Sequence, residues 1–396
     1  MRSQTLSRVT ASRITPSRVA ALAALSLLSG CGQLLGGGSA DTSLGQTATT
    51  RTVFGYATAD EPQAALAARQ ILNQGGNAAD AAAAAGFVLS VTLPSRAGLG
   101  GGGACIVKMG NAQPPVALLF PARAPATLSG ARPAAVPALA RGLLALQARY
   151  GILPAASVIV PAERLAGGAP VSPALESDLQ VVGNALAADP AAAAVFAPGG
   201  VTLPEGATLV QPDLAATLES LRVLGVQGLY AGSYAQKFTA AANQAGAGLL
   251  ASDLVNSAPQ FAAPVLSANG SLTTAALPNP APGSLQPATA SFSALDKNGG
   301  VVSCAVTMNN LFGTGRIAPG TGILLAAAPR PSQPAILAAS VTYTANGTFR
   351  ATATGTGQGA ISRANAISCP GGVPGGEATC TATADPSGQG LAIGGR

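Results

Sequence analysis

The sequence contains serine, threonine and cysteine side chains that could act as nucleophiles, but it contains no histidine. Ser-His-Asp and Cys-His catalysis are therefore excluded, together with metal sites that need imidazole. The cysteines form no C-x-x-C motif, and the glycine-rich run 98–103 lacks the lysine and hydroxyl residue of a phosphate-binding loop. We therefore expect neither a metal nor a cofactor, and any hydrolytic chemistry must use another base.

The charge balance excludes nucleic acid as an expected partner. The chain carries 21 lysines and arginines against 15 acids, a net charge of +6. Four arginines lie in an N-terminal segment that we expect to be removed, which leaves 21 − 4 = 17 basic residues against 15 acids. No basic run remains and aromatic residues make up 4% of the chain, so the usual electrostatic footprint is missing. With 48% apolar and only 9% charged residues, the chain is predicted to be globular.

Residues 1–30 have the pattern of a signal peptide. Arginines without acids precede an apolar stretch, residues 19–28, that is too short to span a bilayer permanently. The sequence LSGC at 28–31 resembles a bacterial lipobox, so we expect lipidation of Cys31; an ordinary signal peptide is the alternative. Residues 31–52 are rich in Gly, Ser and Thr and are predicted to form a flexible tether. The expected location is the bacterial cell envelope, with a lipid anchor in the outer membrane and the protein facing the periplasm.

The pattern along the rest of the chain predicts helices first and strands later. Proline near the start and glycines at the end predict a helix over 61–74, capped by Asp60, and a nearly all-apolar second helix follows over 77–92. Further helices are predicted at 134–150, 154–167 and 212–224. Strands are predicted at 104–108, 116–120, 289–295, 301–308 and 338–354.

Several segments, in order, resemble the γ-glutamyltransferase family. The sequence GNAADAA at 76–82 and the glycine-rich run 98–103 are similar to the family's GGNAxDAA helix start and GxGGGG loop. The sequence TASFSALDKNG at 289–299 looks like the TTHxSVxDKxG start of the family's small subunit. Further similar segments are 135–154, 209–221 and 307–315. The resemblance covers roughly residues 53–360.

This resemblance implies an α+β fold, the four-layer α-β-β-α sandwich of the N-terminal nucleophile hydrolases. Residues 53–288 would correspond to the large subunit and 289–396 to the small subunit, together forming one domain that stays associated after a backbone break between them. The Pro-rich segment 270–288 lacks periodicity and is predicted to be an exposed loop before the break. Residues 366–396 are Gly-rich and are expected to form a peripheral tail.

The resemblance also assigns the catalytic residues. The break falls between Ala288 and Thr289, so Thr289 becomes the first residue of the small piece and the nucleophile. A threonine hydroxyl needs an adjacent base, and a newly released α-amino group, with a pKa of about 8, can serve without histidine. Thr307 falls on the family threonine that activates the nucleophile, and Asn309 falls on the asparagine that contacts the glutamyl substrate.

The family's oxyanion hole comes from a GSPGG loop, which the sequence GTGQG at 355–359 resembles. Gln358 and Gly359 would then supply the backbone N–H donors. The implied activity is that of an autoprocessing threonine-nucleophile amidohydrolase or acyltransferase acting on small-molecule γ-glutamyl or related amides.

Most substrate-holding residues of the family are missing. Pro121 stands in place of the arginine in the family's DFRE segment, with Arg96 and Arg123 as possible substitutes. No acid follows the sequence GILL at 322–325, where the family has the aspartate that binds the substrate amino group. A zwitterionic substrate needs such charged partners when it is desolvated. The alternative is therefore a catalytically inactive lipoprotein of this fold that serves as an envelope binding or scaffold module; an unrelated fold is a third possibility.

Besides Cys31 the sequence has four cysteines, which permits two disulfides in an oxidising compartment. Cys369 and Cys380 flank a loop rich in Pro and Gly and are the favoured pair. Cys105 and Cys304 lie on predicted core strands, where they could form a second pair or remain buried thiols.

Overall fold

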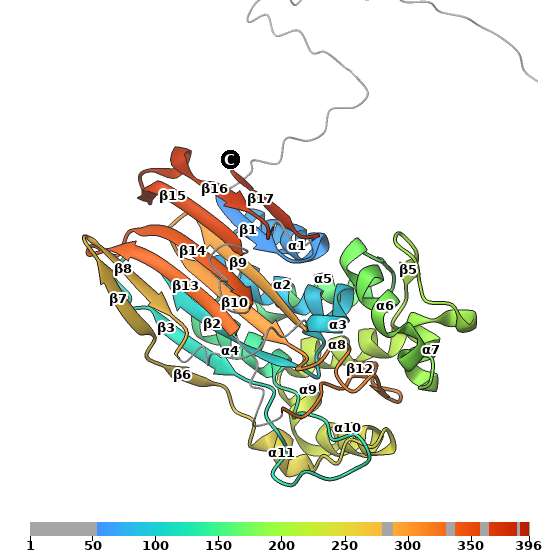
Figure 1. The fold of residues 1–396 in the computed structure, drawn as a ribbon. Helices are drawn as coiled ribbons and strands as arrows, with labels where there is room; N and C mark the ends of the chain where they lie inside the picture. The colour runs from blue at the N-terminus through green and yellow to red at the C-terminus, as the bar shows by residue number, and fades with distance from the viewer. Residues whose placement is uncertain (1–53, 279–287, 330–336, 357–363, 386–388, 396) are drawn as a thin grey trace, which may run out of the picture. The chain divides into compact units, whose positions relative to one another are not determined.

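The strand that begins with Thr289 is an interior strand of an antiparallel sheet. The computed structural model describes residues 54–278, 288–329, 337–356, 364–385 and 389–395. The first sheet has the strand order β17-β1-β9-β10-β2-β3-β6 (Figure 1). Its strands are β1 (Gly55–Ala59), β2 (Gly102–Lys108), β3 (Val116–Phe120), β6 (Gln260–Ala262), β9 (Thr289–Asp296), β10 (Val301–Thr307) and β17 (Leu391–Gly395).

A second antiparallel sheet packs face to face on the first and has the order β16-β15-β14-β13-β8-β7. Its strands are β7 (Val265–Asn269), β8 (Leu272–Ala276), β13 (Leu337–Thr344), β14 (Phe349–Thr356), β15 (Asn365–Val373) and β16 (Thr381–Thr383). Val341, Phe349 and Ile367 of this sheet share one apolar cluster with Ile106 and Leu295 of the first sheet. Two short ribbons pair β4 (Ala169–Pro170) with β5 (Thr208–Leu209) and β11 (Ile317–Ala318) with β12 (Ile323–Leu324).

Helices pack on the other face of the first sheet. Helix α1 lies against β1, α2 against β9 and β10, and α4 against β2 and β3 (Figure 1). The helices are α1 (Pro62–Asn73), α2 (Ala78–Thr92), α3 (Pro94–Ala97), α4 (Leu139–Tyr150), α5 (Ala155–Ala166), α6 (Pro173–Leu186), α7 (Pro190–Phe196), α8 (Pro212–Leu224), α9 (Gln227–Tyr230), α10 (Gly232–Gln244) and α11 (Ala251–Val255). None of these helices is long and apolar enough to cross a membrane, within the described residues.

Helix α2 is buried on all sides, as its almost wholly apolar sequence predicts. Its first turn is closed by a capping box, in which the Asn77 side chain accepts from two backbone N–H groups and the Asp80 carboxylate accepts from the Asn77 N–H. Gly86 allows a close approach to α4, because a Cβ there would lie 2.7 Å from the Leu143 side chain. Small residues therefore let α2 lie close to its neighbours.

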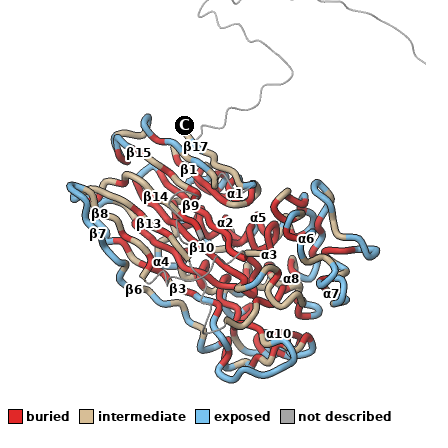
Figure 2. The backbone as a smooth tube through the Cα atoms, in the orientation of Figure 1, coloured by how far each residue is buried: buried red, intermediate tan, exposed pale blue. Residues whose placement is uncertain are grey.

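Strand β9 has apolar side chains on one face and hydroxyl-bearing side chains on most of the other. Ala290, Phe292 and Ala294 belong to the apolar cluster formed with the helices. Thr289, Ser291 and Ser293 lie on the other face, towards the second sheet, because side chains alternate along a strand. All eight residues of β9 are buried, and Figure 2 shows the central strands of this sheet as an interior layer. The nucleophile proposed from the sequence therefore begins a strand that is held on both sides.

The structure has the predicted α+β class, with the two packed antiparallel sheets that the family resemblance implies. The α-helices of the described residues lie before residue 256, and α1, α2, α3 and α4 contact strands of the first sheet. In the described part of the chain the order of layers is therefore helices, first sheet, second sheet.

Two predictions about the second half of the chain are wrong. The segment 270–288, predicted to be a loop, contains β8, which pairs with both β7 and β13, while its part 279–287 lies outside the described residues. The segment 366–396, expected to be a peripheral tail, supplies most of β15 in the second sheet and all of β17, which pairs with β1. Gly-rich and Ala/Thr-rich sequences carry little hydrophobic signal, so sheet pairing rather than local pattern determines these strands.

Candidate active site

Thr289 and Thr307 lie directly opposite each other at one end of the first sheet. Thr289 is the first residue of β9 and Thr307 the last residue of β10, and the two are register partners. On its other side Thr307 is paired with Gly102, the first residue of β2. Both threonines are buried, with 4% and 3% of their surface exposed. The structure thus brings together the two catalytic threonines predicted from the sequence.

The carbonyl group that precedes Thr289 is held by two donors. The Thr307 Oγ1 hydroxyl donates to the Ala288 oxygen at 2.9 Å, and the Met308 N–H donates to the same oxygen at 3.2 Å. Thr307 Oγ1 also accepts from the Asn309 N–H at 2.9 Å. Because the hydroxyl has one proton, accepting from Asn309 directs that proton towards Ala288. The peptide bond predicted to break therefore carries a polarised carbonyl.

Asn309 anchors the turn that follows β10. Its backbone φ is 62°, in the left-handed region that asparagine tolerates better than most residues. Its side-chain Nδ2 donates to the carbonyl oxygens of Ala122 at 3.2 Å and Ala327 at 2.8 Å. These bonds hold the turn in place and orient the Thr307 hydroxyl through the Asn309 N–H. The substrate contact implied by the family resemblance stays a prediction.

The glycine-rich run before β2 allows backbone segments to approach the site closely. A Cβ on Gly102 would lie 2.3 Å from the backbone nitrogen of Ala122, and a Cβ on Gly100 would lie 2.2 Å from the Leu324 oxygen. No side chain fits at either position. The glycines therefore pack the end of β2 against the segments after β3 and at β12, beside Thr307.

Asp60 is a site residue that the sequence reasoning assigned to another role. It was expected to cap α1, but Glu61 is the N-cap residue, and its side chain accepts from the Ala64 N–H at 3.1 Å. Asp60 instead accepts from the Ser291 N–H at 2.7 Å and from Asn365 Nδ2 at 2.5 Å. Asp60 therefore fixes the backbone of β9 two residues after Thr289. The sequence signal that could have identified this role is the position of Asp60, an acid directly after the buried strand β1.

Burial raises the pKa of Asp60 from 3.8 to about 6, and the nearby Asp385 acts in the same direction. The hydrogen bonds from Ser291 and Asn365, and the charge of Arg96, lower this pKa but do not offset the loss of solvation. The carboxyl group therefore binds a proton more tightly in the folded than in the unfolded chain. Folding is consequently less favourable above pH 6, where Asp60 is ionised, than below pH 4, where it is protonated in both states.

Replacing Asp60 with asparagine should flatten the pH dependence of stability. Between pH 4 and pH 7 the raised pKa should cost the wild-type protein on the order of 2–3 kcal/mol of unfolding free energy, an upper figure because the side chain is only partly buried. Asp60→Asn removes this titration, so its unfolding free energy should fall less over the same range. Urea unfolding at four pH values would measure both, with the exposed Asp213→Asn as the control. Parallel curves for wild type and Asp60→Asn would contradict this assignment.

The two arginines considered as substitutes for the missing substrate-binding arginine have different surroundings. Arg96 forms a two-pronged ion pair with Asp178, with Nε and Nη2 at 2.7 and 2.6 Å from its oxygens. The same carboxylate accepts from the Ser95 hydroxyl at 2.6 Å. Arg123 is exposed, just beyond the end of β3. Arg96 is therefore committed to a structural ion pair, and neither arginine is shown to face Thr289.

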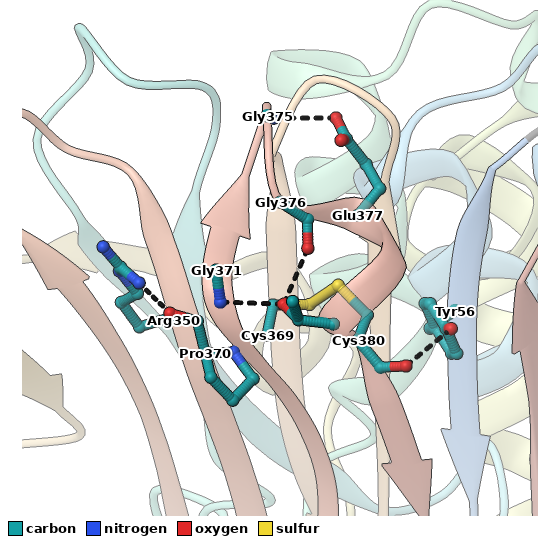
Figure 3. Close-up of a disulfide and its surroundings, with 10 residues drawn as sticks. Tyr56, Arg350, Cys369, Pro370, Gly371, Gly375, Gly376, Glu377 and Cys380 are labelled. Atoms are coloured by element: carbon teal, nitrogen blue, oxygen red, sulfur yellow. Dashed lines mark hydrogen bonds between the residues drawn. A yellow bond between two sulfur atoms is a disulfide. The ribbon is translucent and has the colours of Figure 1, made fainter.

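Several predicted site residues lie outside the described residues, namely Cys31, Gln358 and Gly359. Their predicted roles in lipidation and in the oxyanion hole stay predictions. Cys369 and Cys380 are joined by a disulfide beside a loop that Glu377 closes by accepting from the Gly375 N–H (Figure 3). Cys105 and Cys304, for which the sequence left two possibilities, also form a disulfide.

Comparison with known proteins supplies the family. The model of the family described as gamma-glutamyltranspeptidase matches residues 64–286, more than half of the 396-residue chain. The chain belongs to the γ-glutamyltranspeptidase family. The match ends just before Thr289, so the family assignment rests on the large-subunit-like segment. The roles given to Thr289, Thr307 and Asn309 rest on the resemblance of the small-subunit-like segment and on the geometry described above.

This γ-glutamyltranspeptidase family member is similar to precursors of two kinds of enzyme. It is 34% identical over 209 residues to the Acylase ACY 1 proenzyme of Pseudomonas sp. (strain SE83), a match that covers 47% of this chain and 38% of that protein. It is 31% identical over 218 residues to the Glutathione hydrolase proenzyme of Bacillus subtilis (strain 168), covering 49% and 36%. The matches thus span well under half the length of these relatives.

Among solved structures, the γ-glutamyltranspeptidase family member is similar to a cephalosporin acylase from Bacillus halodurans. The TM-score is 0.66 at 20% sequence identity, over 77% of this chain and 78% of the acylase chain. At this identity the similarity shows the shared fold, which here includes the two packed sheets.

Proposed function

We propose that this protein is an autoprocessing threonine-nucleophile amidohydrolase or acyltransferase that acts on γ-glutamyl or related amides. One observation carries the proposal. The carbonyl oxygen of Ala288, immediately before Thr289, accepts hydrogen bonds from Thr307 Oγ1 and from the Met308 N–H. Two donors on one carbonyl oxygen are the arrangement that stabilises the oxyanion formed in acyl transfer.

The proposed self-cleavage has two steps. The Thr289 hydroxyl oxygen attacks the Ala288 carbonyl carbon, and the negative charge that develops on the Ala288 oxygen is stabilised by the two donors. The C–N bond then breaks as the departing nitrogen takes a proton, which leaves Ala288 joined to Thr289 as an ester. Water hydrolyses this ester and releases a carboxylate on Ala288 and a free α-amino group on Thr289.

The released α-amino group is the general base of the mature enzyme. With a pKa of about 8 it is partly unprotonated near neutrality and can accept the proton of the Thr289 hydroxyl. The hydroxyl attacks a substrate amide, the amine leaves with a proton, and the acyl group is held as an ester on Thr289. Water or an acceptor amine then takes the acyl group. No histidine is required, which agrees with a sequence that has none.

A pair of chromogenic amides tests the activity and the substrate class together. The γ-glutamyl anilide carries an α-amino group, and the glutaryl anilide differs only by lacking it. Because the acid that holds this amino group in the family has no equivalent after residues 322–325, we expect the cleaved protein to hydrolyse both with similar kcat/KM. Thr289→Ala should hydrolyse neither. A strong preference for the γ-glutamyl anilide would show that another group binds the ammonium.

The second candidate is an inactive member of the family that serves as an envelope binding or scaffold module. The ion pair between Arg96 and Asp178 favours this inactive candidate. Substrate binding would need a cation, and Arg96 is already bound to Asp178. If the protein cleaves itself but hydrolyses neither anilide, this result would support the inactive candidate. It would also exclude an enzyme that acts on these two substrates.

We also propose that the protein is lipid-anchored at Cys31 in the bacterial envelope, faces the periplasm, and is tethered by residues 31–52. The two disulfides support an oxidising compartment of this kind. Mass spectrometry of the N-terminal peptide from membranes should find an acylated Cys31, and a soluble, unacylated wild-type protein would contradict the anchor.

A further inference from the structure

The disulfide between Cys105 and Cys304 joins segments that lie on opposite sides of the predicted cleavage point. Cys105 is in β2 and Cys304 is in β10, and the two residues are register partners with their Cα atoms 4.0 Å apart. They are separated by 199 residues along the chain. The bond between Ala288 and Thr289 lies between them in sequence, so cleavage there places one cysteine in each fragment.

We infer that the Cys105–Cys304 disulfide is a covalent cross-link between the two fragments of the mature protein. This inference rests on the proposed cleavage before Thr289. It gives the small fragment a covalent partner, whereas the expectation from the family was only that the pieces stay associated. The fragments cannot separate after cleavage unless this bond is reduced.

The position of the cross-link makes it relevant to the active site. In the first sheet, β10 and β9 come from the small fragment and β2 from the large one, so the contact between β10 and β2 is a boundary between fragments. Cys304 lies three residues before Thr307 on β10, and Cys105 lies opposite it on β2. The cross-link therefore fixes the register that places Thr307 between Thr289 and Gly102.

The cross-link is protected in the folded protein. Cys105 and Cys304 both have 0% of their surface exposed, and they belong to the apolar cluster between the first sheet and the helices. A thiol reductant must reach a sulfur atom to exchange with it, so reduction should require unfolding. After unfolding, the bond keeps both fragments in one molecule, and refolding remains independent of protein concentration.

The second disulfide provides a matched control. Cys369 and Cys380 both lie after Thr289, so their bond closes a loop within the small fragment (Figure 3). Among the contacts between fragments at this place is a hydrogen bond from the Tyr56 hydroxyl to the Cys380 carbonyl oxygen at 2.9 Å. Removing this disulfide should leave the two fragments linked through Cys105 and Cys304.

Denaturing gel electrophoresis and intact mass measurement, with and without reductant, test the inference. We expect residues 32–396 to give two fragments when denatured and reduced, and a single species of their summed mass when denatured without reductant. Cys105→Ala/Cys304→Ala should give two fragments in both conditions, and Cys369→Ala/Cys380→Ala should behave like wild type. Two fragments from the wild type without reductant would overturn the cross-link while leaving the cleavage intact.

An inserted protease site keeps the test independent of self-cleavage. If the reduced wild type stays a single chain, the proposed autoprocessing fails, and the cross-link is tested after a site-specific protease cuts a recognition sequence placed within 279–287. The cut protein should remain one species without reductant and separate with it. Separation without reductant would overturn the cross-link by itself.

Discussion

Replacing Thr307 with valine should slow the cleavage before Thr289 by about 10²–10³-fold. Valine has nearly the shape of threonine but cannot donate a hydrogen bond to the Ala288 oxygen. Of the two donors to this oxygen, only the Met308 N–H would remain. The partly buried Asn309 N–H would also lose its acceptor, which costs some stability. The measurement is the rate at which freshly refolded, uncleaved protein converts to two fragments, followed by reduced intact mass.

Two further variants separate the loss of this donor from a general disturbance of the sheet. Thr307→Ser keeps the hydroxyl and should cleave within about tenfold of the wild type. Ser293→Ala removes another buried hydroxyl from the same face of the first sheet, one that contacts Ser303 and Thr354 and not Ala288. It should cleave at the wild-type rate. Equal rates for Thr307→Val and Ser293→Ala would show that the Thr307 hydroxyl does not stabilise the oxyanion.

Replacing Phe292 with alanine should lower the unfolding free energy by about 3–5 kcal/mol. The ring is fully buried on the helix-facing side of β9, and its Cζ atom would lie 3.1 Å from a Cβ at Gly86 of α2. Removing it opens a cavity between the nucleophile strand and the buried helix, where the backbone is too tightly packed to collapse. Urea unfolding at a single pH would measure the loss.

Phe261→Ala is the matched control for this cavity. Phe261 is on the edge strand β6, is only partly buried, and has the edge of Tyr150 and the guanidinium of Arg149 as its aromatic and cationic neighbours. Its removal should cost less than half as much, because solvent and flexible side chains can fill the space. Similar losses for the two variants would contradict the tightly packed interface between β9 and α2.

Many elements of the fold could be predicted from local sequence. Helix α1 was predicted to within a residue because Pro62 opens it and Gly75 and Gly76 follow it, and α8 was predicted at its observed bounds, 212–224. Strands β9 and β10 follow from their alternating or continuous apolar patterns and the Asp296 turn, in which the carboxylate accepts from two backbone N–H groups. These elements carry their own start and stop signals.

Other elements could not be predicted because long-range pairing determines them. β17 is Gly-rich and pairs with β1 from the far end of the chain, and β8 depends on β7 and β13 for its hydrogen bonds. In each case the local sequence has no hydrophobic periodicity from which the partner could be inferred.

The candidate site likewise has parts that local sequence predicts and parts that depend on long-range pairing. Residue types and motif order were enough to place Thr289 and Thr307, and β pairing then puts them opposite each other. The donors to the Ala288 oxygen, the clamp of Asp60 on Ser291 and the bond from Cys105 to Cys304 depend on strand register. Register depends on the whole sheet, and a shift of one residue would reverse every side chain.

The most direct measurement is the intact mass of residues 32–396, denatured and reduced, for the wild type beside Thr289→Ala. We expect two fragments from the wild type, split between Ala288 and Thr289, and one full-length chain from the variant. A single full-length chain from both would contradict self-cleavage by a threonine nucleophile and leave an inactive member of the γ-glutamyltranspeptidase family.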